Sequence, residues 1–344
     1  VQVDVIADAK RSEIPVARLR LDEAAAGITA LDLVEQLQDG QPAMETDPQR
    51  AREKLGKVSG PYWLSLTAPE EEDLEWLGRN FGFHPLTLED CRTYNPRPKL
   101  EEYPGYLFLV LHEAALSEDE VQVRDLQFYF SQGYLITVQK DRSNLLDRAR
   151  ERDFDLSRGS DFLLYRILNQ LAEDHFDILG KLDERIEVVE EEVVSRPERH
   201  VLHRIFQMRQ ALITLLRLAA PSREILHQLN THDYPYICAE HQLYFRDVYN
   251  SLVSIHEMIE TQRDLTNGAL EAYMSAVSNS LNEVVKRLTL IATIFMPITF
   301  ITGFWGMNIK ALPLEEPVIL WLTLGLIILV PLGMLAWFRA RSWV

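Results

Sequence analysis

Two long apolar runs near the end of the chain constrain its fold more than any other feature. No charged residue occurs from Leu288 to Trp305, and a second uncharged run extends from Pro317 to Phe338. As a helix, each run is long enough to cross a bilayer core about 30 Å thick. Buried helices of a large soluble core are the alternative, but two successive runs flanked by charge favour membrane spans. The sequence therefore predicts spans at 288–305 and 318–338, joined by a loop at 306–317.

Basic residues flank the two runs on the same predicted side. Lys286 and Arg287 precede the first run, and Arg339 and Arg341 lie in the tail at 339–344. Because lysine and arginine accumulate on the cytoplasmic flank of membrane segments, we expect both termini in the cytoplasm and the loop outside.

A long helix is predicted immediately before the first run. Residues from about Glu240 to Met296 contain no proline and a single glycine, Gly268, and their apolar positions recur at helical spacing. Such a helix would be roughly 85 Å long and continuous with the first span. It needs partners, either copies of itself around an axis or other helices of the chain. We assign 237–287 as its cytoplasmic stalk.

The rest of the chain divides into a helical segment and a mixed segment. Residues 156–236 predict two antiparallel helices that meet near Ser195, and their dense acidic run is interpreted as a solvated helix face. Residues 1–155 predict an α/β domain. Its expected strands are 62–67, 106–112, 125–130 and 134–139, and its expected helices are 28–38 and 70–81.

The charge balance narrows the function classes. There are 52 acidic and 35 basic residues, which gives a formal net charge of −17. This balance argues against nucleic-acid binding and favours cations as partners. No G-x-S-x-G elbow, P-loop or H-E-x-x-H motif is present, so we do not expect an enzyme.

The tripeptide Gly306-Met307-Asn308 follows the first run, where a membrane helix would emerge. The stretch from Ser278 to Asn308, together with F-H-P-L-T-L-E-D at 83–90, R-P-K-L-E-E-Y at 97–103 and Y-F-R-D-V-Y-N at 244–250, resembles the CorA magnesium channels. The resemblance implies a funnel-shaped homopentamer in a bacterial or archaeal inner membrane, surrounded by lipid. Its long helices would line a pore for hydrated Mg²⁺, with Co²⁺ and Ni²⁺ as further ions, and its α/β cytoplasmic domain would sense Mg²⁺.

The resemblance also implies roles for individual residues. The selectivity filter would be Gly306, Met307 and Asn308, and two acidic loop residues, Glu315 and Glu316, would draw cations to the mouth. Together with Val285, six positions recur every three or four residues and so define one helix face; these pore-lining and gate positions are Asn282, Leu288, Ala292, Met296, Thr299 and Gly303. Asp90 and Asp247 match positions that hold a regulatory Mg²⁺ between subunits, and Glu89 and Asp174 are candidates for a second ion.

Two other functions stay open at this point. A zinc transporter of the same superfamily would share the fold, although Met307 favours magnesium. Zinc also prefers nitrogen and sulfur ligands, and the predicted pore face has no His or Cys. A membrane-anchored scaffold would explain the spans but not a polar Asn308 at the pore mouth.

Overall fold

The computed structural model describes residues 31–36, 42–45, 55, 60–93, 97–117, 120–151, 156–307 and 317–341. The chain divides into two compact units. The first comprises Val1–Val189 and His203–Asn267, and the second comprises Glu190–Leu202 and Gly268–Val344. Each unit is described separately below.

A seven-stranded sheet forms the centre of the first unit. Its strands are β1 (Leu31–Gln36), β2 (Pro42–Glu45), β3 (Tyr62–Thr67), β4 (Lys99–Tyr103), β5 (Tyr106–Ser117), β6 (Glu120–Ser131) and β7 (Tyr134–Gln139). They lie in the order β2-β1-β3-β7-β6-β5-β4, with β3 parallel to β7 and the other pairs antiparallel. The four expected strands are confirmed, and β5 and β6 extend beyond the predicted ends as a long hairpin.

The helix predicted over 28–38 is wrong in its described part, since Leu31–Gln36 forms strand β1. This strand pairs with β2 on one side and with β3 on the other, with Leu33 opposite Leu64 and Val34 opposite Trp63. The apolar pattern of the segment L-D-L-V-E-Q is compatible with both a helix and a strand. Pairing with a buried neighbour strand favours the strand. Tertiary pairing overrides the helical propensity of its leucines and glutamate.

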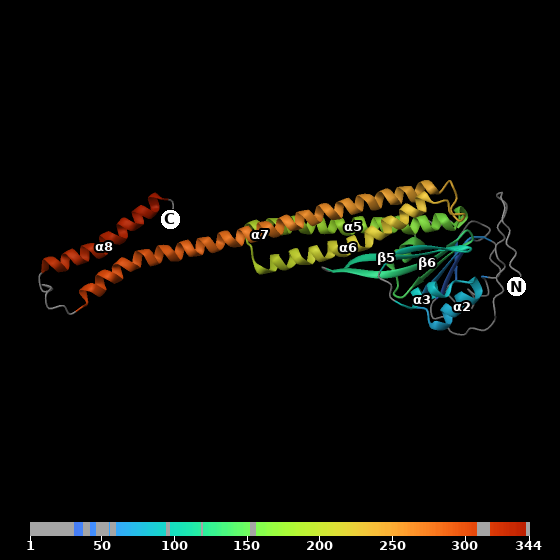
Figure 1. Cartoon of the computed structure of the whole chain (residues 1–344), viewed down its shortest axis with the longest axis horizontal. Coiled ribbons are helices and arrows are strands. Elements are labelled where there is room, and N and C mark those ends of the chain that lie inside the picture. The colour runs from blue at the N-terminus through green and yellow to red at the C-terminus, as the bar shows by residue number, and fades with distance from the viewer. Residues whose placement is uncertain are drawn as a thin grey trace. The chain divides into compact units, whose positions relative to one another are not determined.

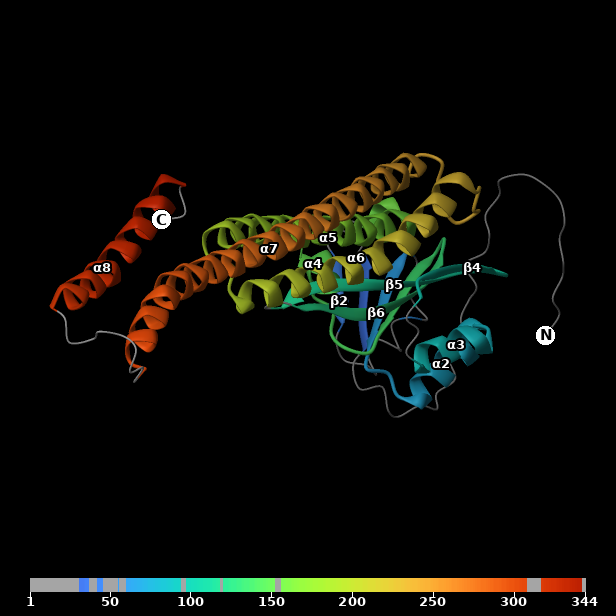
Figure 2. The same ribbon diagram turned by 60° about the vertical axis from the view of Figure 1, so that its left-hand side comes forward.

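The two faces of the sheet are covered by different helices (Figures 1 and 2). On one face, alternate strand residues such as Leu64, Phe108 and Tyr129 pack with α2 (Glu71–Phe81) and α3 (Pro85–Arg92). On the other, Trp63, Leu109 and Phe128 pack against α4 (Asn144–Glu151) and three long helices, α5 (Ser160–Ser195), α6 (Arg199–Thr231) and α7 (Gln242–Trp305). The period-two alternation of strand side chains separates these two cores. The α/β fold predicted for the N-terminal region is confirmed.

Three long helices follow the sheet. A short 3₁₀ turn, η1 (Leu156–Arg158), precedes α5 (Ser160–Ser195). A short connection then leads to α6 (Arg199–Thr231). The predicted helix pair and its turn near Ser195 are confirmed. α7 (Gln242–Trp305) has 64 residues and includes the first apolar run and residues 242–287 of the predicted stalk without interruption, so the helix begins five residues later than predicted. α8 (Pro317–Ala340) contains the second run.

α7 and α8 are, among the described residues, the two helices long and apolar enough to cross a membrane. The apolar window of α7 is 0% buried within the chain, and that of α8 is 6% buried. A core helix of a soluble protein would be mostly covered, so this exposure favours lipid or other subunits as the surroundings. The predicted division of the chain into functional segments, with boundaries after residues 155, 236 and 287, stays a prediction.

Candidate pore and cation sites

The predicted pore face lies on the C-terminal part of α7, in the second unit. All six predicted pore-lining residues are exposed within the single chain: Asn282, Leu288, Ala292, Met296, Thr299 and Gly303. Leu288 is 66% exposed and Met296 is 73% exposed. Because one helix turn takes 3.6 residues, their spacing keeps them on one side of the continuous helix. The structure therefore presents these residues together as an uncovered stripe.

Threonine hydroxyls within the apolar part of α7 are hydrogen-bonded to the helix itself. Thr299 Oγ1 donates to the carbonyl oxygen of Phe295 at 2.9 Å, and Thr293 Oγ1 donates to Thr289 O at 2.7 Å. Since a hydroxyl has one hydrogen and two acceptor lone pairs, Thr299 retains acceptor capacity on its outer side. Water bound to a metal cation points its hydrogens outward, so this acceptor suits a hydrated ion.

α7 ends at the predicted filter. Gly306 N donates to Thr302 O at 2.9 Å, and Met307 N donates to Phe304 O at 3.3 Å. A Cβ added at Gly306 would lie 3.2 Å from Thr302 O, so the tight turn at this helix end favours glycine. Gly306 and Met307 are both exposed. The third filter residue, Asn308, and the loop residues Glu315 and Glu316 lie outside the described residues.

Glu89 and Asp90 are placed by the short helix α3 in the first unit. His84 caps this helix by accepting the Leu86 N–H on Nδ1 at 3.2 Å, and Pro85 occupies its first turn. Glu89 is exposed, while the Asp90 side chain is 18% exposed. Asp90 Oδ2 lies 2.7 Å from Nζ of Lys99 on β4, so this carboxylate has an ammonium partner in its own chain.

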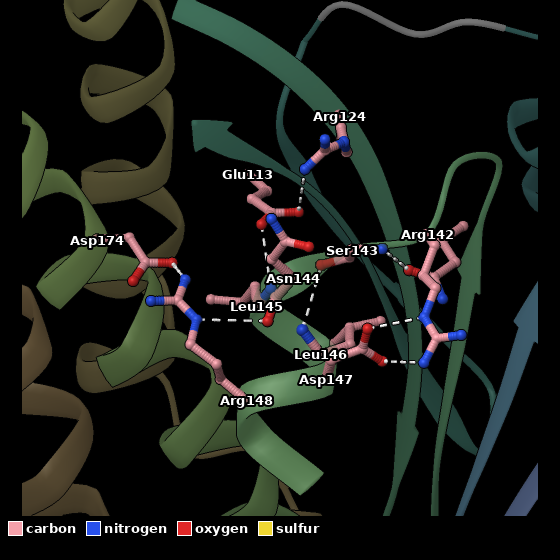
Figure 3. A network of polar contacts seen from close by, with 11 residues as sticks. Glu113, Arg124, Arg142, Ser143, Asn144, Leu145, Leu146, Asp147, Arg148 and Asp174 are labelled. Atoms are coloured by element: carbon pink, nitrogen blue, oxygen red, sulfur yellow. Dashed lines mark hydrogen bonds and ion pairs between the residues drawn. The ribbon is translucent and has the colours of Figure 1, made fainter. Parts of the chain in front are cut away.

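Asp174, on α5, is buried and is held by donors of its own chain. Figure 3 shows the side chain of Arg148 reaching from α4 to Asp174, where its Nη2 donates to Oδ2. Gln170 Nε2 donates to Oδ1 at 3.0 Å. Burial raises the pKa of the Asp174 carboxyl, against the lowering effects of Gln170 and Arg148. A metal ion at Asp174 would have to displace or share these partners.

The same network fixes the start of α4 (Figure 3). Buried Glu113 on β5 accepts the Leu145 N–H on Oε1 at 3.0 Å, and Ser143 Oγ accepts the Leu146 N–H at 3.2 Å. A carboxylate at a helix N-terminus is favoured by the helix dipole. Glu113 thus fixes α4 on the sheet, and α4 in turn holds Arg148 at Asp174.

Asp247 is exposed on the first turns of α7. Burial and, second, the negative charge of Asp247 raise the pKa of Tyr165 on α5. Tyr165 also contacts Tyr244, with ring centroids 4.9 Å apart. Asp247 therefore lies beside an aromatic group at the surface of the helical layer, where it is open to solvent in the single chain.

Within the described residues of a single chain, no three His, Cys, Asp or Glu side chains converge to hold a metal ion. The structure brings Asp90 to Lys99 and Asp174 to Arg148. Neither basic partner was predicted from the sequence. Strand alternation places Lys99 on the same side of β4 as Glu101, but the packing of α3 on that side is not readable from the pattern.

Comparison with known proteins identifies the family. Residues 58–340 match the model of the CorA-like Mg2+ transporter protein family. The cobalt/magnesium transport protein CorA of Thermotoga maritima is 36% identical over 300 residues, which cover 83% of this chain and 84% of the relative. A zinc transport protein, ZntB of Yersinia pseudotuberculosis, is 21% identical over 298 residues, covering 84% of this chain and 89% of that protein.

A solved structure supports the fold. The complete structure of the CorA magnesium transporter from Methanocaldococcus jannaschii superposes with a TM-score of 0.78 at 22% identity, covering 93% of this chain and 100% of that one. The match includes the sheet, the long helices and the C-terminal apolar helices. On the family model and the sequence relatives together, the chain belongs to the CorA-like Mg2+ transporter family.

Proposed function

We propose that the chain is one subunit of a homopentameric channel that carries hydrated Mg²⁺, and also Co²⁺ and Ni²⁺, across a membrane into the cytoplasm. The observation that carries the proposal is the uncovered stripe of α7 from Asn282 to Gly303, which ends at Gly306 and Met307. On an unburied apolar helix, this stripe has polar side chains at Asn282 and Thr299 and apolar side chains between them, including Leu288 and Met296, as a narrow gated pore requires. Family membership supports the same transport activity.

Exposed apolar side chains on the stalk support an assembly of several copies. Before the apolar run begins, α7 exposes large apolar side chains at Met258, Leu265, Met274, Val277, Leu281 and Val284. Met274 is 60% exposed and Leu281 is 62% exposed. Outside the bilayer these residues would contact water unless another helix covered them. Copies of the same helix around an axis would cover them, and the number five follows from the family resemblance.

The chemistry of magnesium explains why the proposed filter uses neutral oxygens. Mg²⁺ holds its inner waters tightly, so complete dehydration in the pore would be costly. A ring of Asn308 side chains would accept hydrogen bonds from those waters without stripping them. Thr299, whose hydroxyl hydrogen is donated to Phe295, would provide a second ring of acceptors deeper in the pore. Neutral ligands also let the ion leave.

Two apolar rings would close the pore. Leu288 and Met296 lie on the exposed stripe and would constrict it by excluding water when the subunits pack tightly. Lys286 and Arg287 precede the first ring and would face the cytoplasm, together with Arg339 and Arg341. This orientation places both termini in the cytoplasm of a bacterial or archaeal cell.

Regulation by cytoplasmic Mg²⁺ is proposed at the boundary between subunits. Asp90 on α3 of one copy and Asp247 on α7 of the next would repel each other when Mg²⁺ is scarce and be bridged when it is abundant. The filled site would then favour the closed arrangement. Glu89, which is exposed, would assist a second ion more readily than Asp174, whose two oxygens already accept hydrogen bonds.

The test is Mg²⁺ uptake into liposomes containing the purified protein, with Asn308→Ala compared against the native chain. Asn279→Ala serves as the matched control, because Asn279 is exposed on α7 outside the predicted pore stripe. We expect uptake to be lost in Asn308→Ala and retained in Asn279→Ala, with the oligomer intact in both. Equal uptake in all three proteins would show that Asn308 is not the selectivity site. Zinc uptake without magnesium uptake would favour the zinc-transporting branch that ZntB represents.

A further inference from the structure

Lys99 lies between two carboxylates at the edge of the sheet. Its Nζ is 2.7 Å from Oδ2 of Asp90 and 3.0 Å from Oε1 of Glu101. Lys99 and Glu101 are two residues apart on edge strand β4, so their side chains share a face, and α3 carries Asp90 above it. The predicted regulatory carboxylate is therefore paired with an ammonium group of its own subunit, which it shares with Glu101.

The position of the ammonium group is built into the fold. The Lys99 side chain is 27% exposed, and its Nζ lies 5.6 Å from the centroid of the Phe108 ring, whose face attracts a cation. Tyr103 holds the second carboxylate, because its hydroxyl donates to Glu101 Oε2 at 3.0 Å. Three elements, β4, β5 and α3, thus fix the distance between Lys99 and Asp90.

We propose that Lys99 is a tethered counter-ion that competes with Mg²⁺ for Asp90 and so sets the Mg²⁺ concentration at which the regulatory site fills. The inference rests on the proposed regulatory role of Asp90. It assigns Lys99 as a positioning and affinity-setting residue that itself binds no metal. A dication approaching Asp90 must either displace the ammonium group or bind beside it and bear its repulsion.

The direction of the effect follows from charge. Asp90, Glu89, Glu101 and Lys99 together carry a formal charge of −2, and loss of the ammonium changes it to −3. Repulsion between a dication and a single positive charge a few ångströms away, in a solvent-exposed setting, corresponds to roughly ten- to thirtyfold in affinity. Removing Lys99 should therefore strengthen Mg²⁺ binding, whereas removing a metal ligand weakens it.

The experiment measures the Mg²⁺ concentration that gives half-maximal protection of the full-length oligomer in detergent against proteinase K. Lys99→Met removes the charge and keeps an apolar stem over Phe108. We expect its midpoint to fall at least about tenfold below that of the native protein. Lys99→Arg, which keeps the charge, should stay near the native midpoint. Lys181→Met removes an exposed lysine of α5 and should leave the midpoint unchanged.

The variant Asp90→Asn distinguishes failure of the proposed regulatory role of Asp90 from failure of the competing role of Lys99. If Asp90→Asn raises the midpoint while Lys99→Met leaves it unchanged or raises it, the regulatory site stands and the competing role of Lys99 is refuted. If Asp90→Asn leaves the midpoint at the native value, Asp90 is not the regulatory ligand and both ideas fail. Should Lys99→Met lose the oligomer, Lys99→Gln provides the same test with a polar side chain.

Discussion

Nδ1 of His241 lies 2.8 Å from Oδ2 of Asp161, although 80 residues separate them in the sequence. The two side chains are 10% and 7% exposed. The same Asp161 oxygen accepts the Cys238 N–H at 2.8 Å, and Oδ1 accepts the Phe162 N–H at 2.9 Å. One carboxylate therefore joins the first turn of α5 to the segment that leads into α7, the helix proposed to line the pore.

Replacement of Asp161 by alanine should destabilise the first unit by about 3 kcal/mol, because it leaves the buried His241 and two backbone N–H groups without their acceptor. Thermal unfolding followed by circular dichroism would show a midpoint several degrees lower. Asp177→Ala is the matched control, since Asp177 is an exposed aspartate on the same helix. Equal midpoints for the two variants would contradict a structural role for the pair.

Much of the fold was predictable because periodicity and length are strong signals. The lack of proline across about 240–296 predicted the continuous α7, and the apolar runs predicted the two candidate spans. Strands at 62–67 and 134–139 were recognisable from aromatic and β-branched residues. The strand at 31–36 was not, because its pairing with β3 is non-local and its own composition is ambiguous.

The pore stripe could be predicted from the sequence, but the surroundings of the proposed regulatory carboxylates could not. Helical spacing placed the pore stripe from Asn282 to Gly303 on one face, since that geometry is local. The partners of the proposed regulatory carboxylates were not predictable: Lys99 reaches Asp90 only because α3 packs on β4, and Arg148 reaches Asp174 only because Glu113 fixes α4. Such contacts depend on packing between distant segments.

Thr299→Val should reduce Mg²⁺ uptake by about fivefold or more, because it removes a hydrogen-bond acceptor for the ion's waters while keeping the side-chain shape. Stopped-flow uptake in liposomes measures this. Thr293→Val is the matched control: Thr293 makes an equivalent bond to its own helix, to Thr289 O, but lies outside the predicted stripe. A similar loss in both variants would indicate a general effect on the helix and not a role in the pore.

Leu288→Ser should make the closed channel leak. A hydroxymethyl ring wets more readily than an apolar one, so the barrier that excludes water falls. We expect severalfold higher uptake at high Mg²⁺ concentrations, at which the proposed regulatory site would close the native channel. Ile291→Ser tests specificity, since Ile291 is 57% exposed on the same helix but outside the predicted stripe. Unchanged leakage in Leu288→Ser would exclude Leu288 as a gate.

Tyr62 should make the stability of the first unit fall as the pH becomes alkaline. Its side chain is buried against Tyr134, with ring centroids 6.0 Å apart, and within the described part of the chain its hydroxyl has no hydrogen-bond partner. Burial first, and then the neighbouring Tyr134, raise the pKa of Tyr62 above its ordinary value. At alkaline pH the phenol of Tyr62 therefore stays neutral in the folded state, whereas the same phenol has lost its proton in the unfolded chain.

Since the unfolded chain binds fewer protons above pH 10, the free energy of unfolding should fall by up to about 1.4 kcal/mol per pH unit for this group. Tyr62→Phe removes that slope and a buried hydroxyl without a partner, so it should equal or exceed the native stability at pH 7 and exceed it clearly at pH 11. Denaturant unfolding at both pH values measures the difference. A stability difference that does not grow between pH 7 and pH 11 would show that Tyr62 ionises equally in both states, and burial would then not control its proton.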